Sequence, residues 1–255
     1  MTDPQIKVKI IPQLKDNYSY VIYSYEKKLA AIIDPAESTS IIDFIQKKSL
    51  TIETIILTHH HDDHTAGVQD ILNFSSVSVY SPDKNISRTS QVVRNNDQIN
   101  LSFLSLKVLA TPGHTLDHLI FYDEHNKILF SGDTLFRFGC GRVFEGTYEQ
   151  MQLSLQLLVG LDNAAQVYCG HEYTLKNLDF LLSIFPDNEE LKISKQRINE
   201  QINTTGSSIP FNLGEEKRLN PFLNPRSSYY QDFMKKNKFN DLAMFSYLRD
   251  LKNKY

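Results

Sequence analysis

The stretch Thr58-His59-His60-His61-Asp62-Asp63-His64 decides how this sequence is interpreted. It follows the compact apolar run Thr54–Leu57, which predicts a strand that leads directly into a histidine cluster. In an extended chain, residues i and i+2 point the same way, so His59 and His61 share a side. A turn into a helix would swing Asp63 and His64 to an adjacent direction. Imidazole and carboxylate groups are ligands that zinc, iron and manganese accept, so the stretch predicts metal binding.

Three further segments place a ligand-type side chain at the end of an apolar run. His114 follows Thr111-Pro112-Gly113, Asp133 follows Ser131-Gly132, and His171 follows Cys169-Gly170. Glycine permits the tight backbone that lets a strand end project its side chain into a shared site. We therefore expect these three residues to complete the ligand set.

Four neighbouring residues of ligand type are left outside this set. His125 falls in a predicted turn, and His118 is interpreted as a structural or supporting residue. His60 and Asp62 alternate away from the side on which His59 and His61 lie.

The order of elements predicts a β-rich α/β domain over residues 1–172 and a small helical domain over residues 173–255. The predicted strands are Ile6–Ile11, Ser19–Tyr25, Lys28–Ile33, Thr54–Leu57, Val77–Tyr80, Leu104–Ala110, His118–Tyr122, Ile128–Ser131 and, as the last one, Gln166–Cys169. The predicted helices run from Ser38 or Thr39 to about Lys48, from Thr147 to Val159, and over Thr174–Phe185, Asn188–Asn203 and Asp241–Lys252. Thr147 and Gln150 form a capping box at the second of them.

Composition limits the class of protein. The chain has 255 residues, of which 41% are hydrophobic and 22% charged, as expected for a globular protein with a sizeable core. No run approaches the roughly 18 apolar residues of a membrane span. The first residues alternate and carry charge, unlike a secretory signal, so we expect a cytoplasmic protein. Cys140 and Cys169 are the 2 cysteines, too few for a disulfide framework.

Charge is distributed unevenly along the chain. Residues 1–186 have a net charge of −6, and residues 187–255 have a net charge of +3. Neither value suits a nucleic-acid-binding surface, which is strongly basic and clustered. The basic C-terminal part suits a small anionic ligand, although a solvated helical surface explains its charge equally well.

Together, these residues resemble the metallo-β-lactamase superfamily and, within it, the glyoxalase II family of hydroxyacylglutathione hydrolases. The resemblance runs from about Lys9 to the C-terminus. The matching motifs are Asp16-Asn17-Tyr18, Thr58-His59-His60-His61 with Asp63-His64, Thr111-Pro112-Gly113-His114-Thr115, Gly132-Asp133-Thr134-Leu135-Phe136, Gly139-Cys140-Gly141-Arg142, Phe144-Glu145-Gly146-Thr147, His171-Glu172-Tyr173-Thr174, Asn220-Pro221-Phe222-Leu223 and Arg249-x-x-Lys252. Asp62, Asp117 and Phe144 depart from residues that are common in the family, but none of them is an expected ligand.

The resemblance implies an αββα sandwich followed by a small all-helical C-terminal domain, with two divalent metal ions. It assigns His59, His61 and His114 to one ion, Asp63, His64 and His171 to the other, and Asp133 to both. Zinc is the preferred metal, and iron and manganese are the alternatives. The residues at glutathione-contacting positions are Arg142, Phe144, Tyr173, Arg249 and Lys252.

The implied activity is hydrolysis of S-(2-hydroxyacyl)glutathione, typically S-D-lactoylglutathione, to glutathione and D-lactate, the second step of methylglyoxal detoxification. Asp63 and Asp133 are the implied catalytic residues, acting with a hydroxide that bridges the metals. We expect a monomer with a small-molecule glutathione thioester as its partner, and neither nucleic acid nor a membrane.

Three alternatives remain open at this point. A persulfide dioxygenase with a single iron shares the histidine motif, but the second ligand set and the helical domain argue against it. Another hydrolase of the superfamily, such as a nuclease, would need a basic groove. A non-catalytic zinc protein would usually have a closed site rich in cysteine.

Overall fold

A computed structural model describes residues 5–86 and 88–255 and divides the chain into two compact units. Unit 1 comprises Met1–Ala110 and Asp117–Gly132, and unit 2 comprises Thr111–Leu116 and Asp133–Tyr255. Residues 1–4, where the predicted first domain starts and on which the expected lack of a secretory signal partly depends, lie outside the described residues.

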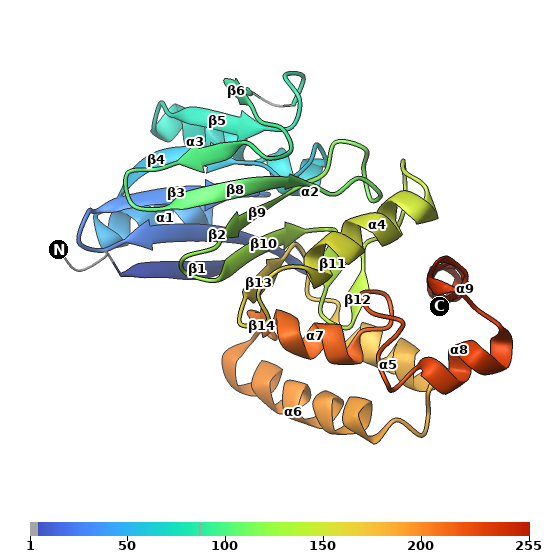
Figure 1. Ribbon diagram of the computed structural model, residues 1–255. Helices are drawn as coiled ribbons and strands as arrows, with labels where there is room; N and C mark the ends of the chain where they lie inside the picture. The colour runs from blue at the N-terminus through green and yellow to red at the C-terminus, as the bar shows by residue number, and fades with distance from the viewer. Residues whose placement is uncertain (1–4, 87) are drawn as a thin grey trace. The chain divides into compact units, whose positions relative to one another are not determined.

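Unit 1 contains a sheet with the strand order β1-β2-β3-β4-β5-β6 (Figure 1). Its strands are β1 (Ile6–Gln13), β2 (Asn17–Ser24), β3 (Leu29–Ile33), β4 (Thr51–Ile56), β5 (Ser78–Ser81) and β6 (Gln91–Val92). Pairing is antiparallel from β1 to β3 and parallel from β3 to β6. Every residue of β2 is buried, so both faces of the sheet are covered there.

One face of this sheet is covered by helices. Unit 1 has the helices α1 (Thr39–Lys48), α2 (Asp62–Thr65) and α3 (Val68–Phe74). Ile41 and Ile45 of α1 and Val68 and Ile71 of α3 share one hydrophobic core with inward-facing strand residues such as Ile32. The helices thus bury the apolar stripe that their sequence spacing predicts.

The other face of the sheet meets a second group of strands in unit 1. These are β7 (Gln98–Asn100), β8 (Ser105–Ala110), β9 (Leu119–Asp123) and β10 (Ile128–Gly132), paired antiparallel in that order. The rings of Tyr20 in β2 and Phe130 in β10 lie 5.5 Å apart and connect the two strand groups. Unit 1 is therefore layered as helix, sheet and sheet.

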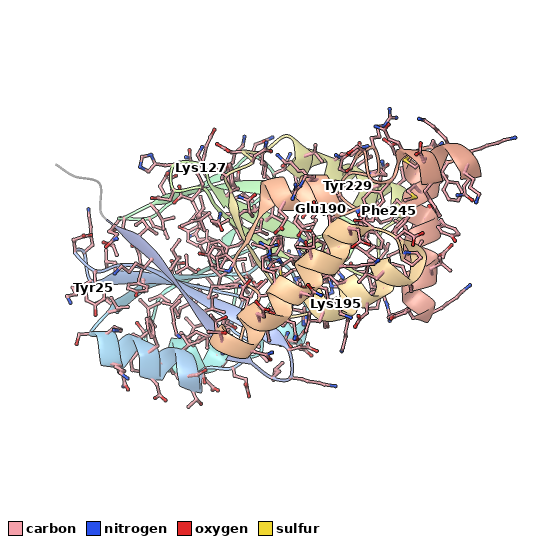
Figure 2. All side chains as sticks on the ribbon, turned by 90° about the horizontal axis from the view of Figure 1, so that it is seen from below. Tyr25, Lys127, Glu190, Lys195, Tyr229 and Phe245 are labelled. Atoms are coloured by element: carbon pink, nitrogen blue, oxygen red, sulfur yellow. The ribbon has the colours of Figure 1, made fainter. Side chains whose placement is uncertain are left out.

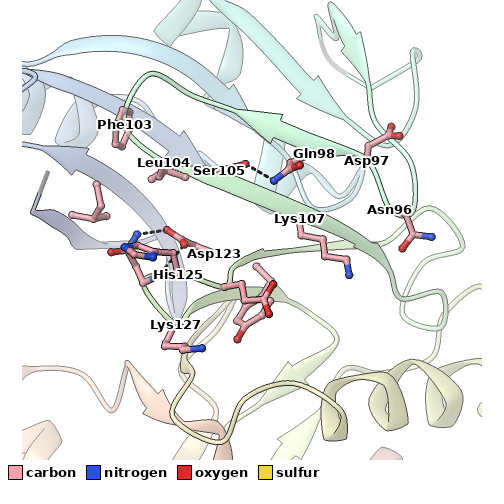
Figure 3. Close-up of a pocket in the computed structure, with 14 residues that line it drawn as sticks. Asn96, Asp97, Gln98, Phe103, Leu104, Ser105, Lys107, Asp123, His125 and Lys127 are labelled. Carbon is pink, nitrogen blue, oxygen red and sulfur yellow. Dashed lines mark hydrogen bonds between the residues drawn. The ribbon is translucent and has the colours of Figure 1, made fainter. Parts of the chain in front are cut away.

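A groove of about 870 Å³ opens on unit 1 beside β7, β8 and the turn between β9 and β10 (Figure 3). His125 lies on its rim, in the turn where the sequence predicted it. None of the predicted metal ligands lines this groove, so it is separate from the predicted chemistry.

Unit 2 is mainly helical. Its helices are α4 (Tyr148–Val159), α5 (Thr174–Ile184), α6 (Glu189–Thr205), α7 (Leu213–Leu219), α8 (Gln231–Asn237) and α9 (Asp241–Lys254). It also has two antiparallel strand pairs, β11 (Leu135–Phe136) with β12 (Gly139–Cys140) and β13 (Gln166–Cys169) with β14 (Phe211–Asn212). Across the described residues no helix is long and apolar enough to cross a membrane.

Most predicted elements are confirmed, and one prediction is wrong. The capping box at α4 is present, with Thr147 accepting from the Gln150 amide and the Gln150 side chain accepting from the Thr147 amide. However, Gln166–Cys169 is not the last strand, because the short β14 pairs with it. A strand of two residues carries no periodicity, so the sequence pattern could not show it.

Figure 2 labels Lys195 and Glu190, two charged residues of α6 that pair with neighbouring helices of unit 2. Lys195 of α6 lies 2.5 Å from Asp179 of α5, and Glu190 of α6 lies 3.8 Å from Arg218 of α7. All four side chains are more than 40% exposed, so each pair stabilises the helices only modestly.

Gly67 packs against the loop after β3, and we predict that Gly67→Ala destabilises the protein. A Cβ at this position would lie 2.8 Å from the backbone carbon of Glu37 and 2.9 Å from the carbonyl oxygen of Pro35. Overpacking of this kind costs about 1–3 kcal/mol of unfolding free energy. Denaturant unfolding would measure the cost.

Gly160→Ala is the matched control, because a Cβ there approaches only the Leu157 carbonyl, at 3.4 Å. Both changes reduce the entropy of the unfolded chain similarly. Equal unfolding free energies for the two variants would contradict the prediction.

Candidate functional site

Unit 1 places the four predicted ligands His59, His61, Asp63 and His64 on one strand-to-helix turn. The chain leaves β4, bends at Thr58, His59 and His60, passes His61 in extended conformation, and enters the single turn of α2. Nε2 of His59 lies 3.1 Å from Nδ1 of His61, and the rings of His59 and His64 are 4.3 Å apart. The four side chains therefore lie together, but through a bend at residues 58–60 and not through the extended chain that was expected at His59.

A buried carboxylate orients part of this cluster. Asp34, which follows β3, has Oδ2 3.0 Å from Nδ1 of His64. The same carboxylate accepts hydrogen bonds from the amide of Thr58 at 2.8 Å and its hydroxyl at 2.6 Å. The Thr58 hydroxyl lies 2.9 Å from Nδ1 of His59. Partners on Nδ1 fix the orientation of a histidine ring and leave Nε2 available to bind a metal ion.

Asp63 is held in a similar way. Its Oδ2 accepts from Nδ2 of Asn17 at 2.9 Å, and Asn17 also donates to the Asp63 carbonyl. Oδ2 lies 3.9 Å from Nε2 of His64, so the two predicted ligands face each other within unit 1.

Of the residues left outside the predicted set, His60, Asp62 and His118 lie beside it. His60 and Asp62 are exposed, and Nδ1 of His60 is 3.1 Å from the carboxylate of Asp117. His118 is fully buried and stacks on His59 with ring centroids 4.9 Å apart. A supporting position for His118 agrees with the interpretation from sequence.

Unit 2 brings together the other three predicted ligands, His114, Asp133 and His171. Oδ2 of Asp133 lies 3.3 Å from Nε2 of His114 and 3.4 Å from Nε2 of His171. All three side chains are buried, with about 5% of each residue exposed. Nδ1 of His114 lies 2.8 Å from the carbonyl oxygen of Arg142, so this ring too is anchored through Nδ1 and presents Nε2.

The donor chemistry of both sets fits divalent metal ions. His59, His64 and His114 each have Nδ1 beside a protein acceptor or hydroxyl. This arrangement is typical of metal-binding histidines, whose second nitrogen is held by a carboxylate or carbonyl. The set contains imidazoles and carboxylates but no thiolate, as suits zinc, iron or manganese with open coordination positions.

Three predicted substrate-binding residues lie near the ligands of unit 2. Arg142 is exposed, and its guanidinium lies 5.6 Å from the ring centroid of Phe144. The Phe144 ring is 5.3 Å from that of His114, and Phe144 is 59% exposed. Tyr173 stacks on His171 at 4.8 Å with nearly parallel rings. These groups could contact a ligand beside the metal-binding residues of unit 2.

Arg249 and Lys252, both on α9, have different environments. Arg249 is only 5% exposed and donates to the Cys140 carbonyl at 3.1 Å, so its charge is engaged inside unit 2. Lys252 donates to the Lys176 carbonyl at 3.0 Å. Burial, then the charges of Arg249 and Lys176, lower the pKa of Lys252 to about 8, and the ammonium remains mainly charged at neutral pH.

The sequence patterns did not identify the residues that orient the ligands of unit 1, which are Asp34, Thr58 and Asn17. Asp34 follows the apolar run Lys28–Ile33 and therefore has the same strand-end signature as His114. That signal could have identified Asp34 as part of the site. Its partners Thr58 and His64 lie 24 and 30 residues away, so its role depends on contacts that no local pattern shows.

Comparisons with known proteins cover nearly the whole chain. The family model of the metallo-beta-lactamase superfamily matches residues 14–171, and the model described as hydroxyacylglutathione hydrolase C-terminus matches residues 172–255. The expected αββα class with a following helical part is confirmed, apart from the short β14 within that part. The predicted domain boundary at residue 172 stays a prediction.

Named relatives agree with the family models. A hydroxyacylglutathione hydrolase of Pelagibacter ubique is 37% identical over 253 residues, covering 98% of this chain and 100% of the relative. One from Vibrio campbellii is 36% identical over 254 residues, with the same coverage. Among solved structures, ETHE1 from Myxococcus xanthus has a TM-score of 0.66 at 23% identity, covering 96% of this chain and 99% of that one, and shows a shared fold.

We predict that Asp34→Asn weakens metal binding. The amide keeps the shape but loses the negative charge beside Nδ1 of His64. Loss of such an outer partner typically costs 10–100-fold in metal affinity. Competition with a chromophoric chelator would measure the change.

Asp123→Asn provides the control, because Asp123 is also buried in unit 1 and, among the described residues, holds its own turn through Asn126. It should leave metal affinity within about twofold of wild type, being remote from the ligand set whose outer partners matter. Similar affinities for both variants would show that Asp34 does not orient a ligand.

Proposed function

Because the chain belongs to the metallo-β-lactamase superfamily and, within it, to the hydroxyacylglutathione hydrolases, we propose that it hydrolyses the thioester of S-(2-hydroxyacyl)glutathione. S-D-lactoylglutathione, giving glutathione and D-lactate, is the proposed substrate. The observation that carries this proposal is the full-length match to relatives of that name, including the C-terminal segment.

We propose that seven side chains hold two divalent metal ions. His59, His61 and His114 are assigned to one ion, Asp63, His64 and His171 to the other, and Asp133 to both. Within unit 1 the first four expected ligands lie close together, and within unit 2 Asp133 lies beside both His114 and His171. Zinc is the proposed metal, with iron and manganese as alternatives that the same ligand types accept.

Bound divalent ions would supply Lewis acidity toward the thioester carbonyl and a nucleophilic water at neutral pH. The protein's own contribution is to hold and orient. Asn17 fixes one oxygen of Asp63, and we assign the orientation of the attacking water to this carboxylate. The leaving thiolate has a reference pKa near 8.5, so it departs without a strong general acid.

The glutathione part carries carboxylates that cationic side chains can bind. Arg142 is exposed and suited to bidentate carboxylate contact, and Lys252 offers a point charge. Arg249 donates to the Cys140 carbonyl next to Gly141-Arg142, so we assign it the support of that loop. Phe144 and Tyr173 supply apolar surface beside His114 and His171. A cytoplasmic location and a monomeric state stay predictions.

We predict that purified protein carries about two metal ions per chain and that Asp133→Asn nearly abolishes thioester hydrolysis. The loss should exceed the 10–100-fold that outer partners of a metal ligand contribute, because Asp133 contacts both His114 and His171. Elemental analysis would give the number of metal ions per chain. The absorbance of the thioester bond would give the rate of hydrolysis.

Asp62→Asn is the control, since Asp62 is an exposed neighbour of the ligands in α2. Equal losses from the two aspartate variants would mean that the ligand assignment is wrong. Metal-loaded protein that leaves S-D-lactoylglutathione intact would overturn the proposed function.

We predict that Lys252→Ala raises KM for the glutathione thioester several-fold and leaves kcat nearly unchanged. Loss of a contact made equally in the ground and transition states affects only KM. A partly exposed ion pair contributes about 1 kcal/mol or less. Steady-state kinetics at low and high salt would test this, because screening should shrink the difference.

Lys254→Ala, on the same last turn of α9 but at an exposed position, is the matched control and should keep the wild-type KM. A fall in kcat at constant KM for Lys252→Ala would show that this ammonium acts on the transition state instead.

A further inference from the structure

The hairpin β11–β12 in unit 2 connects a proposed metal ligand to a proposed substrate-binding residue. Asp133 precedes β11 by two positions, and Arg142 follows β12 by two positions. The Gly141 amide donates to the Thr134 carbonyl at 3.3 Å, which keeps the two arms together at their open end. Any shift of the hairpin therefore moves both ends.

Side chains of the C-terminal helices hold the closed end of this hairpin, the turn Arg137-Phe138. The amide of Phe138 donates to Oε2 of Glu216 at 2.8 Å, and the Arg137 carbonyl accepts from Asn177 at 3.1 Å. Asn220 donates to Oε2 of Glu216 at 2.9 Å and to the Gly139 carbonyl at 3.1 Å. Side chains outside the hairpin thus bind the Phe138 amide and the Arg137 carbonyl.

The turn depends on this support. Phe138 has φ +58°, a conformation that favours glycine, and it is fully buried. A non-glycine residue in that region persists only where its surroundings over-determine it. Glu216 is the side chain that binds the amide of this strained residue.

We propose that Glu216 is a positioning residue, which acts through the turn Arg137-Phe138 to hold Asp133 and Arg142 in their working positions. This inference rests on the proposed thioester hydrolysis. Asp133 is additionally held by His114 and His171, whereas the exposed Arg142 side chain lies beside the Phe144 ring. Loosening of the turn should therefore affect substrate binding at Arg142 before it affects the metal ligands.

The environment of Glu216 makes its contribution depend on pH. Burial is the largest cause that raises its pKa, to about 8, and Glu215 on the same helix adds to the rise. The Phe138 amide, Arg137 of the hairpin and Asn220 oppose it. Buried Tyr230 also faces the carboxyl, and its own pKa is raised by burial and by Glu216, so it stays neutral.

The sign of the pH effect follows from these groups. Below about pH 8 Glu216 is a neutral acid, as its burial requires. Above that pH a charge forms on a fully buried carboxyl whose Oε1 has no hydrogen-bond partner among the described residues. Buried charges are costly unless paired, so ionisation favours opening of the turn.

Steady-state kinetics of wild type and Glu216→Gln with S-D-lactoylglutathione from pH 7 to pH 9 test this inference. Gln stays neutral at all these values, so the ratio of wild-type KM to variant KM should rise about threefold or more, with a constant kcat ratio. Lys252 titrates in the same window in both proteins, and its effect cancels in the ratio. Parallel KM profiles would overturn the positioning role.

Glu215→Gln is the matched control, because Glu215 neighbours Glu216 but pairs with Arg137 and Arg197 through a partly exposed side chain. It should keep the wild-type pH dependence of KM. A loss of that dependence in Glu215→Gln as well would assign the effect to the charge network instead of to Glu216.

Hydrogen exchange of residues 133–142, followed by mass spectrometry, gives a readout that needs no activity. Corrected for intrinsic rates, protection should fall from pH 7 to pH 9 in the wild type and stay level in Glu216→Gln. If the thioester is not hydrolysed but this difference in protection appears, the proposed function is wrong, while the stabilisation of the hairpin by Glu216 is supported. Unchanged protection in both proteins would show that Glu216 does not stabilise the hairpin.

Discussion

The buried carboxylate of Asp34 is the contact on which the ligand set of unit 1 depends. It connects the end of β3 to the end of β4 through the amide and hydroxyl of Thr58, and it holds Nδ1 of His64. A carboxylate that is 3% exposed is unfavourable unless every oxygen is paired. The three hydrogen bonds meet that condition, so the same group stabilises the strand ends and fixes a ligand ring.

In unit 2 a backbone carbonyl, and not a carboxylate, orients a ligand ring. Nδ1 of His114 lies against the carbonyl of Arg142, at the open end of the hairpin that also begins beside Asp133. The orientation of this ligand therefore depends on where the hairpin lies. A substitution far from the chemistry, in α7, can consequently reach Arg142 at the open end of the hairpin through the turn that Glu216 holds.

Local patterns predicted the parts of the structure that local physics decides. The capping box of α4 needs only residues three positions apart, and the direction of Asp63 and His64 follows from the entry of the chain into α2. The sequence did not predict β14, which is defined by its partner strand, nor the role of Asp34. Both depend on contacts between distant segments, which periodicity does not encode.

Arg249 shows why the substrate-binding side was harder to predict than the metal ligands. Its position in the final helix suggested a cation at the surface, but its guanidinium reaches a carbonyl 109 residues away, at Cys140. A planar guanidinium with several donors can satisfy backbone carbonyls while it stays charged. The arginine thus holds β12 from the side of α9 while Glu216 holds the turn from α7. Because both ends of the hairpin are fixed by residues that lie in the helical segment, that segment shapes the site even where it offers no contact to a substrate.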